Sequence, residues 1–108
     1  MGFSVHITKA AERDILGAAD YIEYTLKNRK AADDLLNLFE KKISQLVDFP
    51  LAHPIIDDPV LKTWQIRFVM VDRYIAFYIV SEETVYILRF LHETRKWLYI
   101  LKKESDIR

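Results

Sequence analysis

Histidines, arginines and tyrosines are the residues of this chain that could do chemistry, rather than thiols or paired carboxylates. The chain has no cysteine, which excludes disulfides, thiolate metal sites and a cysteine nucleophile. His6 and His53 lack the spacing of metal ligands, so we expect neither a metal nor a cofactor. Asp57 and Asp58 precede Pro59, an arrangement typical of a turn rather than of a catalytic carboxylate pair.

His92 and Arg89 lie on or just after a predicted strand. His92 could carry a proton, because histidine titrates near neutral pH. We interpret it instead as a structural residue that hydrogen-bonds the following turn. Arg89 has Val85 and Ile87 on its predicted face, which favours a paired, partly covered arginine.

Two helices should follow a short N-terminal strand. Residues 3–7 alternate apolar and polar side chains, which predicts a strand. Thr8 is a good N-cap for a helix of about five turns that carries its apolar stripe through residues 11–26. Asn28 is the expected N-cap of a second helix, and Pro50 should stop it. So short a connection predicts an antiparallel helical hairpin.

The second half of the chain changes to a period of two. Segments 63–71, 74–80 and 84–91 are rich in aromatic and β-branched residues, and we expect them to form an antiparallel meander. Residues 94–103 show the pattern of a short amphipathic helix. The predicted class is therefore α+β, with a β-α-α-β-β-β order, a helical hairpin on a small antiparallel sheet and a short C-terminal helix.

The meander is apolar on both predicted faces. A two-layer domain of this size does not need two apolar sheet faces. We therefore expect the C-terminal helix or a partner chain to cover the second face. Strict alternation places Val85, Ile87 and Leu91 on one face and Tyr86, Leu88 and Phe90 on the other.

Composition places the chain among small globular proteins. With 108 residues and 51% hydrophobic residues, it should form one domain over residues 1–108 with a real core. No run of 18 apolar residues predicts a membrane span, and the N-terminus lacks the apolar region of a signal peptide. The absence of cysteine favours a cytoplasmic location.

The net charge of zero hides an asymmetry between the two halves. Residues 1–60 carry 7 Lys and Arg against 10 Asp and Glu, a balance of −3, whereas residues 61–108 carry 9 against 6, a balance of +3. A mildly basic half can face a polyanion, but three charges give only a weak electrostatic attraction.

Several segments resemble the RelE/ParE superfamily of bacterial toxins. They are residues 73–78 (RYIAFY), residues 85–95 (VYILRFLHETR), residues 18–22 (AADYI), and the pairs Phe49-Pro50 and His53-Pro54. Together with the element order, the resemblance covers about residues 3–97. It implies the toxin of a type II toxin–antitoxin pair, neutralised by a cognate antitoxin protein.

Members of this superfamily differ in their targets. RelE-like toxins are ribosome-dependent nucleases that cut mRNA, and ParE-like toxins poison DNA gyrase. If this chain is a metal-independent nuclease, the resemblance implies catalytic roles for Arg67, Arg73, Arg95, Tyr99 and His92.

The nuclease pattern is degraded in this sequence. Gln65 stands at one expected basic position and Ile75 where the family has an arginine. The net charge of zero also suits a ribosome-binding protein poorly. We therefore favour a ParE-like gyrase poison, with an mRNA endonuclease as the alternative and a non-toxic antitoxin-binding homologue as the third hypothesis.

Two binding surfaces follow from this interpretation. We expect the target to contact cations of the basic half: Arg67, Arg73, Arg89, Arg95 and Lys96. We expect the antitoxin to cover apolar residues of the C-terminal helix: Trp97, Leu98, Ile100 and Leu101. The free protein should expose an apolar patch or self-associate as a homodimer to hide it.

Overall fold

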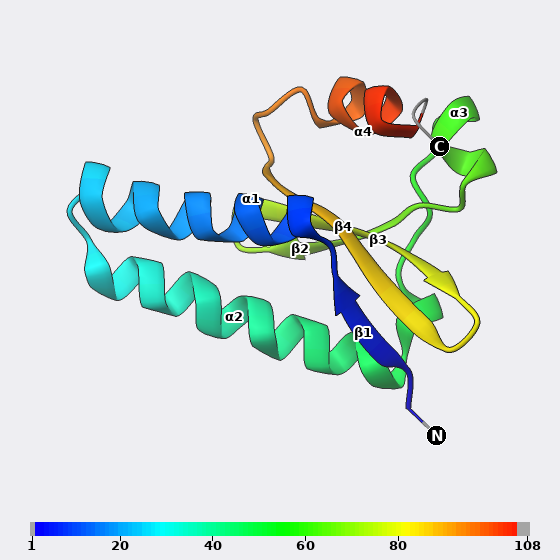
Figure 1. Cartoon of the computed structure of the whole chain (residues 1–108), viewed down its shortest axis with the longest axis horizontal. Helices are drawn as coiled ribbons and strands as arrows, with labels where there is room; N and C mark the ends of the chain where they lie inside the picture. The colour runs from blue at the N-terminus through cyan, green and yellow to red at the C-terminus, as the bar shows by residue number, and fades with distance from the viewer. Residues whose placement is uncertain (1, 106–108) are drawn as a thin grey trace.

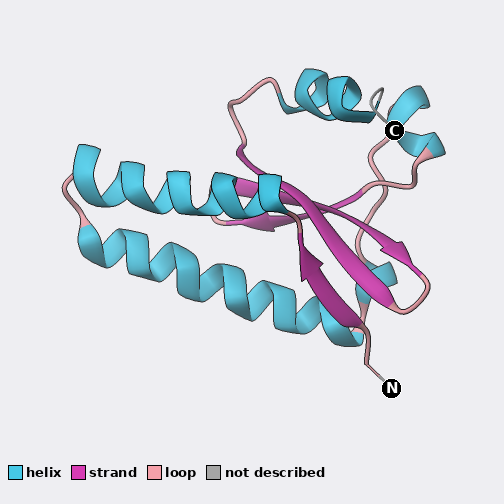
Figure 2. Cartoon of the chain, viewed as in Figure 1, coloured by secondary structure: helices cyan, strands magenta, loops and turns pink. Residues whose placement is uncertain are grey.

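The computed structural model describes residues 2–105, and its element order matches the predicted α+β class (Figures 1 and 2). In chain order the elements are β1 (Ser4–Ile7), α1 (Lys9–Asp20), the π-helical η1 (Tyr21–Thr25), α2 (Arg29–Asp48), the 3-10 turn η2 (Pro50–Ala52), α3 (Pro59–Thr63), β2 (Arg67–Val71), β3 (Tyr74–Ser81), β4 (Thr84–His92) and α4 (Trp97–Ser105).

The four strands form one sheet in the order β1-β4-β3-β2. The meander β2-β3-β4 is antiparallel, as predicted, and β1 joins its β4 edge in parallel. The hairpin of α1 and α2 packs on one face of the sheet (Figure 1). The core on that side joins both helices to the strands through Ile15, Phe39, Val69, Tyr78 and Phe90, among others.

Both predicted helix caps are confirmed. The side chain of Thr8 accepts a hydrogen bond from the Ala11 N–H, and that of Asn28 accepts one from the Ala31 N–H. Helix α2 ends at Asp48, two residues before Pro50, because proline disfavours helical geometry in the residue that precedes it.

The first helix reaches Thr25, close to the predicted end, although its last five residues form the π-helix η1. Two predicted boundaries are wrong. The strand predicted at residues 63–71 begins only at Arg67, because Asp58 caps the short helix α3 and Gln65 takes a positive φ of 55°. The C-terminal helix begins at Trp97 rather than at residue 94.

A β-bulge overturns the predicted alternation in β4. Phe77 pairs with Arg89 but Tyr78 pairs with Ile87, so Leu88 is an extra residue between them. Beyond the bulge the faces exchange: Phe90 packs with the helical hairpin, and Leu91 packs on the opposite face. The prediction that Leu91 shares a face with Val85 and Ile87 is therefore wrong.

The second sheet face is covered by the chain itself. Leu61 of α3 and Leu101 of α4 pack against Ile75, Phe77 and Leu91. The C-terminal helix thus supplies the predicted cover, with α3 beside it, and the molecule has three layers rather than two (Figure 2). Within residues 2–105, no helix has the length and apolar character needed to cross a membrane.

Candidate functional site

A hollow of about 570 Å³ lies where the end of β4 passes α1. We call it the β4-end hollow. It combines side chains of α1, of the start of η1 and β3, and of the loop that follows β4. Its lining residues are Arg13, Asp14, Gly17, Ala18, Tyr21, Tyr74, Phe90, His92, Thr94 and Arg95.

The short length of β1 positions α1 against β4. Strand β1 ends at Ile7, so the edge of β4 beyond Ile87 has no neighbouring strand. The Thr8 hydroxyl lies 2.9 Å from the Ile87 carbonyl oxygen and 3.0 Å from that of Leu88. Asp14 Oδ2 accepts the N–H of Phe90 at 3.0 Å. Side chains of α1 and of its cap therefore satisfy the free edge of the strand.

Arg89 and Asp14 form a largely buried ion pair at the same edge. Arg89 Nε donates to Asp14 Oδ2 at 2.6 Å and Nη2 donates to Oδ1 at 3.0 Å, a bidentate geometry. The two side chains are 15% and 13% exposed. The pair confirms the interpretation of Arg89 as a paired strand residue, and it uses Asp14, the one carboxylate among the described residues that line the hollow.

His92 is held by the turn that follows β4, as the sequence predicts. Its Nδ1 accepts the Thr94 N–H at 3.2 Å and lies 2.8 Å from the Thr94 hydroxyl. Accepting a backbone N–H leaves Nδ1 without a proton, so Nε2 is the nitrogen that carries one. The His92 ring also contacts the Tyr74 ring edge to face, and the Tyr74 ring stacks on that of Phe90 with 5.0 Å between the ring centroids.

Two exposed arginines complete the lining. Arg13 comes from α1 and Arg95 from the loop before α4, and within residues 2–105 neither side chain forms an ion pair. With Asp14 already neutralised, the charge left in the hollow is positive. Such a site can hold an anionic group through guanidinium N–H donors and His92 Nε2.

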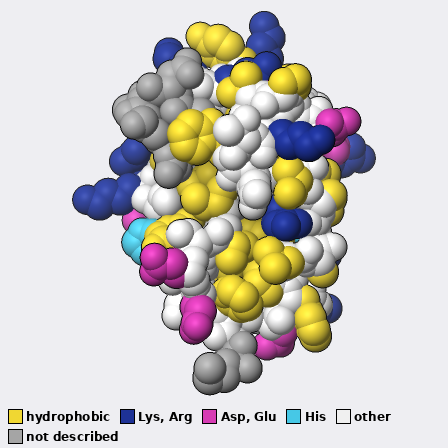
Figure 3. Space-filling view, turned by 90° about the vertical axis from the view of Figure 1, so that its right-hand side faces the viewer, with side chains coloured by type: hydrophobic (Ala, Val, Ile, Leu, Met, Phe, Trp, Pro, Cys, Tyr) yellow, Lys and Arg dark blue, Asp and Glu magenta, His cyan; other side chains and the backbone are white. Residues whose placement is uncertain are grey.

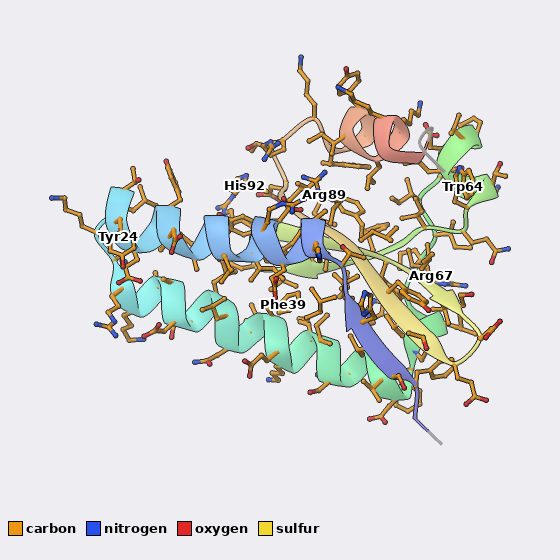
Figure 4. All side chains as sticks on the ribbon, in the orientation of Figure 1. Tyr24, Phe39, Trp64, Arg67, Arg89 and His92 are labelled. Atoms are coloured by element: carbon orange, nitrogen blue, oxygen red, sulfur yellow. The ribbon has the colours of Figure 1, made fainter. Side chains whose placement is uncertain are left out.

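The other residues of the predicted nuclease set lie apart from the hollow or are already bound. In the sheet Arg67 lies opposite Tyr78 of β3, whereas His92 lies opposite Tyr74 of the same strand. Tyr74 and Tyr78 are four residues apart, which corresponds to about 13 Å along the strand. Arg67 Nη1 donates to the His53 carbonyl at 2.6 Å and ties down η2. In Figure 4 Arg67 lies apart from Arg89 and His92, which lie near each other.

Arg73 lies next to the hollow but is paired outside it. It sits in the turn between β2 and β3, and its Nη1 contacts Glu93 Oε2 at 3.1 Å. The backbone N–H of Glu93 also donates to the Arg73 carbonyl at 2.8 Å. The structure thus brings His92 and Arg95 together, and Arg73 adjoins them through Glu93.

The predicted residues of α4 divide between core and surface. Leu101 is 3% exposed, and Trp97 and Ile100 pack partly against the same core cluster. Leu98 and Lys96 are exposed, and Tyr99 is 63% exposed on the outer surface, away from the lining of the hollow. Hydrophobic side chains also gather on the face that carries α3, with Lys and Arg over its upper part (Figure 3).

Three titratable groups elsewhere have shifted pKa values. Burial lowers the pKa of His53, and the nearby Lys42 and Arg67 lower it further. Burial raises the pKa of Tyr78 to about 12. Burial of Asp58 alone would raise the pKa of its carboxyl group. Hydrogen bonds from the Leu61 N–H, Lys102 and the Val60 N–H outweigh this effect, and the pKa lies below its usual value.

Sequence reasoning missed the α1 side of the hollow. Arg13, Gly17 and Tyr21 are spaced by four, which places them on one face of a helix. A cation, a glycine and a tyrosine on one face, opposite the predicted apolar stripe, is the signal that could have found them. Within residues 2–105, no three His, Asp or Glu side chains gather as metal ligands would.

Comparisons with known proteins agree with this architecture. A family model described as the ParE toxin of the type II toxin–antitoxin system parDE matches residues 5–97. The chain belongs to the ParE toxin family. It is a ParE-like member of the RelE/ParE superfamily, as the sequence resemblance indicated.

A solved structure supports the fold of this ParE-family chain. It is titled "Chromosomal ParDE TA system from P. aeruginosa" and superposes with a TM-score of 0.67 at 16% sequence identity. The match covers 83% of this chain and 95% of that one. No curated protein matched the sequence.

Proposed function

We propose that this chain is the toxin of a type II toxin–antitoxin pair and inhibits growth by poisoning DNA gyrase. Membership of the ParE family supports the first part. The observation that carries the second part is the dispersal of the residues that an mRNA nuclease would need.

A metal-independent nuclease needs a base, an acid and phosphate-binding cations within reach of one scissile bond. Here Arg67 is bound to loop carbonyls about 13 Å along the sheet from the level of His92. Arg73 is paired with Glu93, and Tyr99 lies outside the hollow. A protein-binding mode of action requires no such convergence.

The target-binding surface in this proposal is the basic rim of the β4-end hollow. Arg95 lines the hollow and Lys96 follows it in the chain, and both are exposed and can contact a partner directly. Arg73 adjoins them at the surface, whereas Arg89 contributes by fixing β4 against α1. Arg67 lies farther along the sheet and would mark the limit of the contact.

The antitoxin-binding surface in this proposal includes the outer side of α4. Leu98 is exposed, and Trp97 and Ile100 are half-buried, so a partner segment can extend the apolar contacts that α4 already makes. Leu101 supports this surface from below by holding α4 on the sheet. Without antitoxin, two copies of the chain could hide the same surface from water as a homodimer.

The test is a supercoiling and cleavage assay with purified gyrase, relaxed plasmid and ATP. If the chain poisons gyrase, linear DNA accumulates and is released by detergent and protease treatment. Arg95→Ala should reduce the amount of linear DNA. Arg29→Ala, an exposed arginine at the start of α2, is the matched control and should behave as wild type. If gyrase is unaffected while expression causes codon-positioned mRNA cuts, the chain is a nuclease. If expression leaves growth unchanged, it is a non-toxic antitoxin-binding homologue.

A further inference from the structure

Two exposed arginines, Arg13 and Arg95, line the β4-end hollow and give it a positive charge. They come from separate elements, and Asp14, the only carboxylate among the described residues that line the hollow, already accepts from Arg89 and from the Phe90 N–H. The remaining polar groups of the described lining can all donate hydrogen bonds, including His92 Nε2. The hollow is therefore suited to a negatively charged ligand.

The volume and the aromatic walls narrow the class of that ligand. A carboxylate alone would occupy only a small part of the open hollow of about 570 Å³, which leaves room for a ring system beside it. Tyr74 already stacks on Phe90, but Tyr21 is 53% exposed and offers its ring to a ligand. Aromatic side chains beside arginines are the usual means of binding an unpaired base and its phosphate.

Gly17 keeps the floor of the hollow open. It lies in the middle of α1, where glycine is less favourable than alanine. A Cβ atom built at this position meets no other atom within 4 Å, so core packing does not require the glycine. Any larger side chain at residue 17 would extend into the space between Arg13 and Tyr21.

We propose that the β4-end hollow binds one unpaired nucleotide of a nucleic-acid strand, with its phosphate held by Arg13 and Arg95 and its base on the ring of Tyr21. The inference rests on the proposed function only for the source of the strand, because a toxin that acts on a gyrase–DNA complex meets an opened DNA strand in that complex. It adds a contact to DNA inside the hollow to the contact that the basic rim makes with the enzyme, and Arg95 belongs to both.

The test measures fluorescence anisotropy of labelled decathymidylate titrated with the full chain at several salt concentrations. One phosphate neutralised by the protein predicts a slope of log K against log salt of about −0.7, and Arg13→Ala or Arg95→Ala should each weaken binding and flatten this slope. Tyr21→Leu should weaken binding at least about fivefold, whereas Tyr21→Phe keeps the ring and should bind as wild type. Arg29→Ala is the charge-matched control.

Gly17→Leu tests the location without removing a charge. It should abolish binding of the oligonucleotide while circular dichroism shows an unchanged helix content. Equal binding of decauridylate, or tighter binding of decathymidylate, would support the proposal. Tighter binding of decauridylate would identify RNA as the ligand and would overturn the contact to DNA.

Three further outcomes overturn the proposal: no binding of either oligonucleotide at low salt, unchanged binding by the arginine and Gly17→Leu variants, or binding only of a glutamate-rich peptide. Gyrase poisoning with no oligonucleotide binding would refute this inference alone. Oligonucleotide binding with unaffected gyrase would refute the proposed function alone.

Discussion

Replacing Asp14 by alanine should lower the free energy of unfolding by about 3 kcal/mol. The change removes the acceptor of two Arg89 hydrogen bonds and of the Phe90 N–H at once. Arg89 would keep its charge in a site where its side chain is only 15% exposed. The Phe90 N–H would lose its partner at an edge that no strand covers.

The magnitude follows from the burial of the pair. Removing one partner of a buried ion pair costs about 3 to 5 kcal/mol, because the other charge stays uncompensated. The side chains of Arg89 and Asp14 remain 15% and 13% exposed, so water reaches both groups and the expected loss of stability lies at the lower end of this range. With a urea m-value of about 1.5 kcal/mol per molar, a loss of about 3 kcal/mol lowers the midpoint by about 2 M.

The assay is urea unfolding followed by tryptophan fluorescence. Asp14→Asn should lose less than Asp14→Ala, because an amide oxygen can still accept the Phe90 N–H. The double variant Asp14→Leu with Arg89→Met removes both charges, and it should be more stable than the sum of its single changes by about 2 kcal/mol. Asp34→Ala breaks an exposed i,i+4 pair with Lys30 and should cost less than about 0.5 kcal/mol.

Two results would refute this reasoning. If Asp14→Ala costs no more than Asp34→Ala, the edge contact contributes no more than an ordinary surface pair. If the two single changes simply add in the double variant, Asp14 and Arg89 are not coupled, and the short distances between them have no energetic consequence.

Three further changes test contacts outside the hollow. Tyr78→Phe removes the hydroxyl that donates to the Pro50 carbonyl at 2.6 Å and should cost about 1 to 2 kcal/mol in urea unfolding. Because burial raises the pKa of Tyr78 to about 12, the folded state holds this proton more tightly; wild type should therefore lose stability between pH 10 and 12, and the variant should lose less. Burial lowers the pKa of His53, so this residue should titrate below pH 6.5 when followed by NMR. The contribution of the neutral ring to stability is present above pH 6.5 and is lost as the pH falls, and His53→Gln should remove this pH dependence. Asp58→Asn keeps the cap of α3 but loses the ion pair with Lys102, so its melting temperature should fall less than that of Asp58→Ala.

Local signals predicted most of the fold. Thr8, Asn28 and Pro50 each act within one helical turn, so their effect can be read from a few neighbouring residues. Period-two runs likewise predicted three strands of the meander, and two of them agree with the structure to one residue at each end. The chain departs from these expectations where the backbone takes a rarer conformation, at the π-helix and at Gln65.

Only part of the candidate site could be predicted from the sequence, because its residues come from distant segments of the chain. His92 and Arg95 are close in sequence to the strand that positions them, so the family pattern could point to both. Their partners Arg13 and Tyr21 lie more than 70 residues earlier in the printed sequence and reach the hollow only through the packing of α1 on β4. The spacing by four marks one face of α1, but it does not record that this face packs on β4, because that contact depends on where β1 stops.

The β-bulge at Leu88 connects the error in the predicted strand to the formation of the site. Strict alternation from Ile87 would place Arg89 and Leu91 on the hairpin face and turn Phe90 and His92 away from α1. The extra residue reverses that order, so Phe90 enters the helical core and His92 follows it into the hollow beside Arg13. The same residue sends Leu91 to the face that α4 covers. A chain without the bulge would lose the His92 wall of the hollow even if every lining residue were kept, because the site depends on register as well as on residue type.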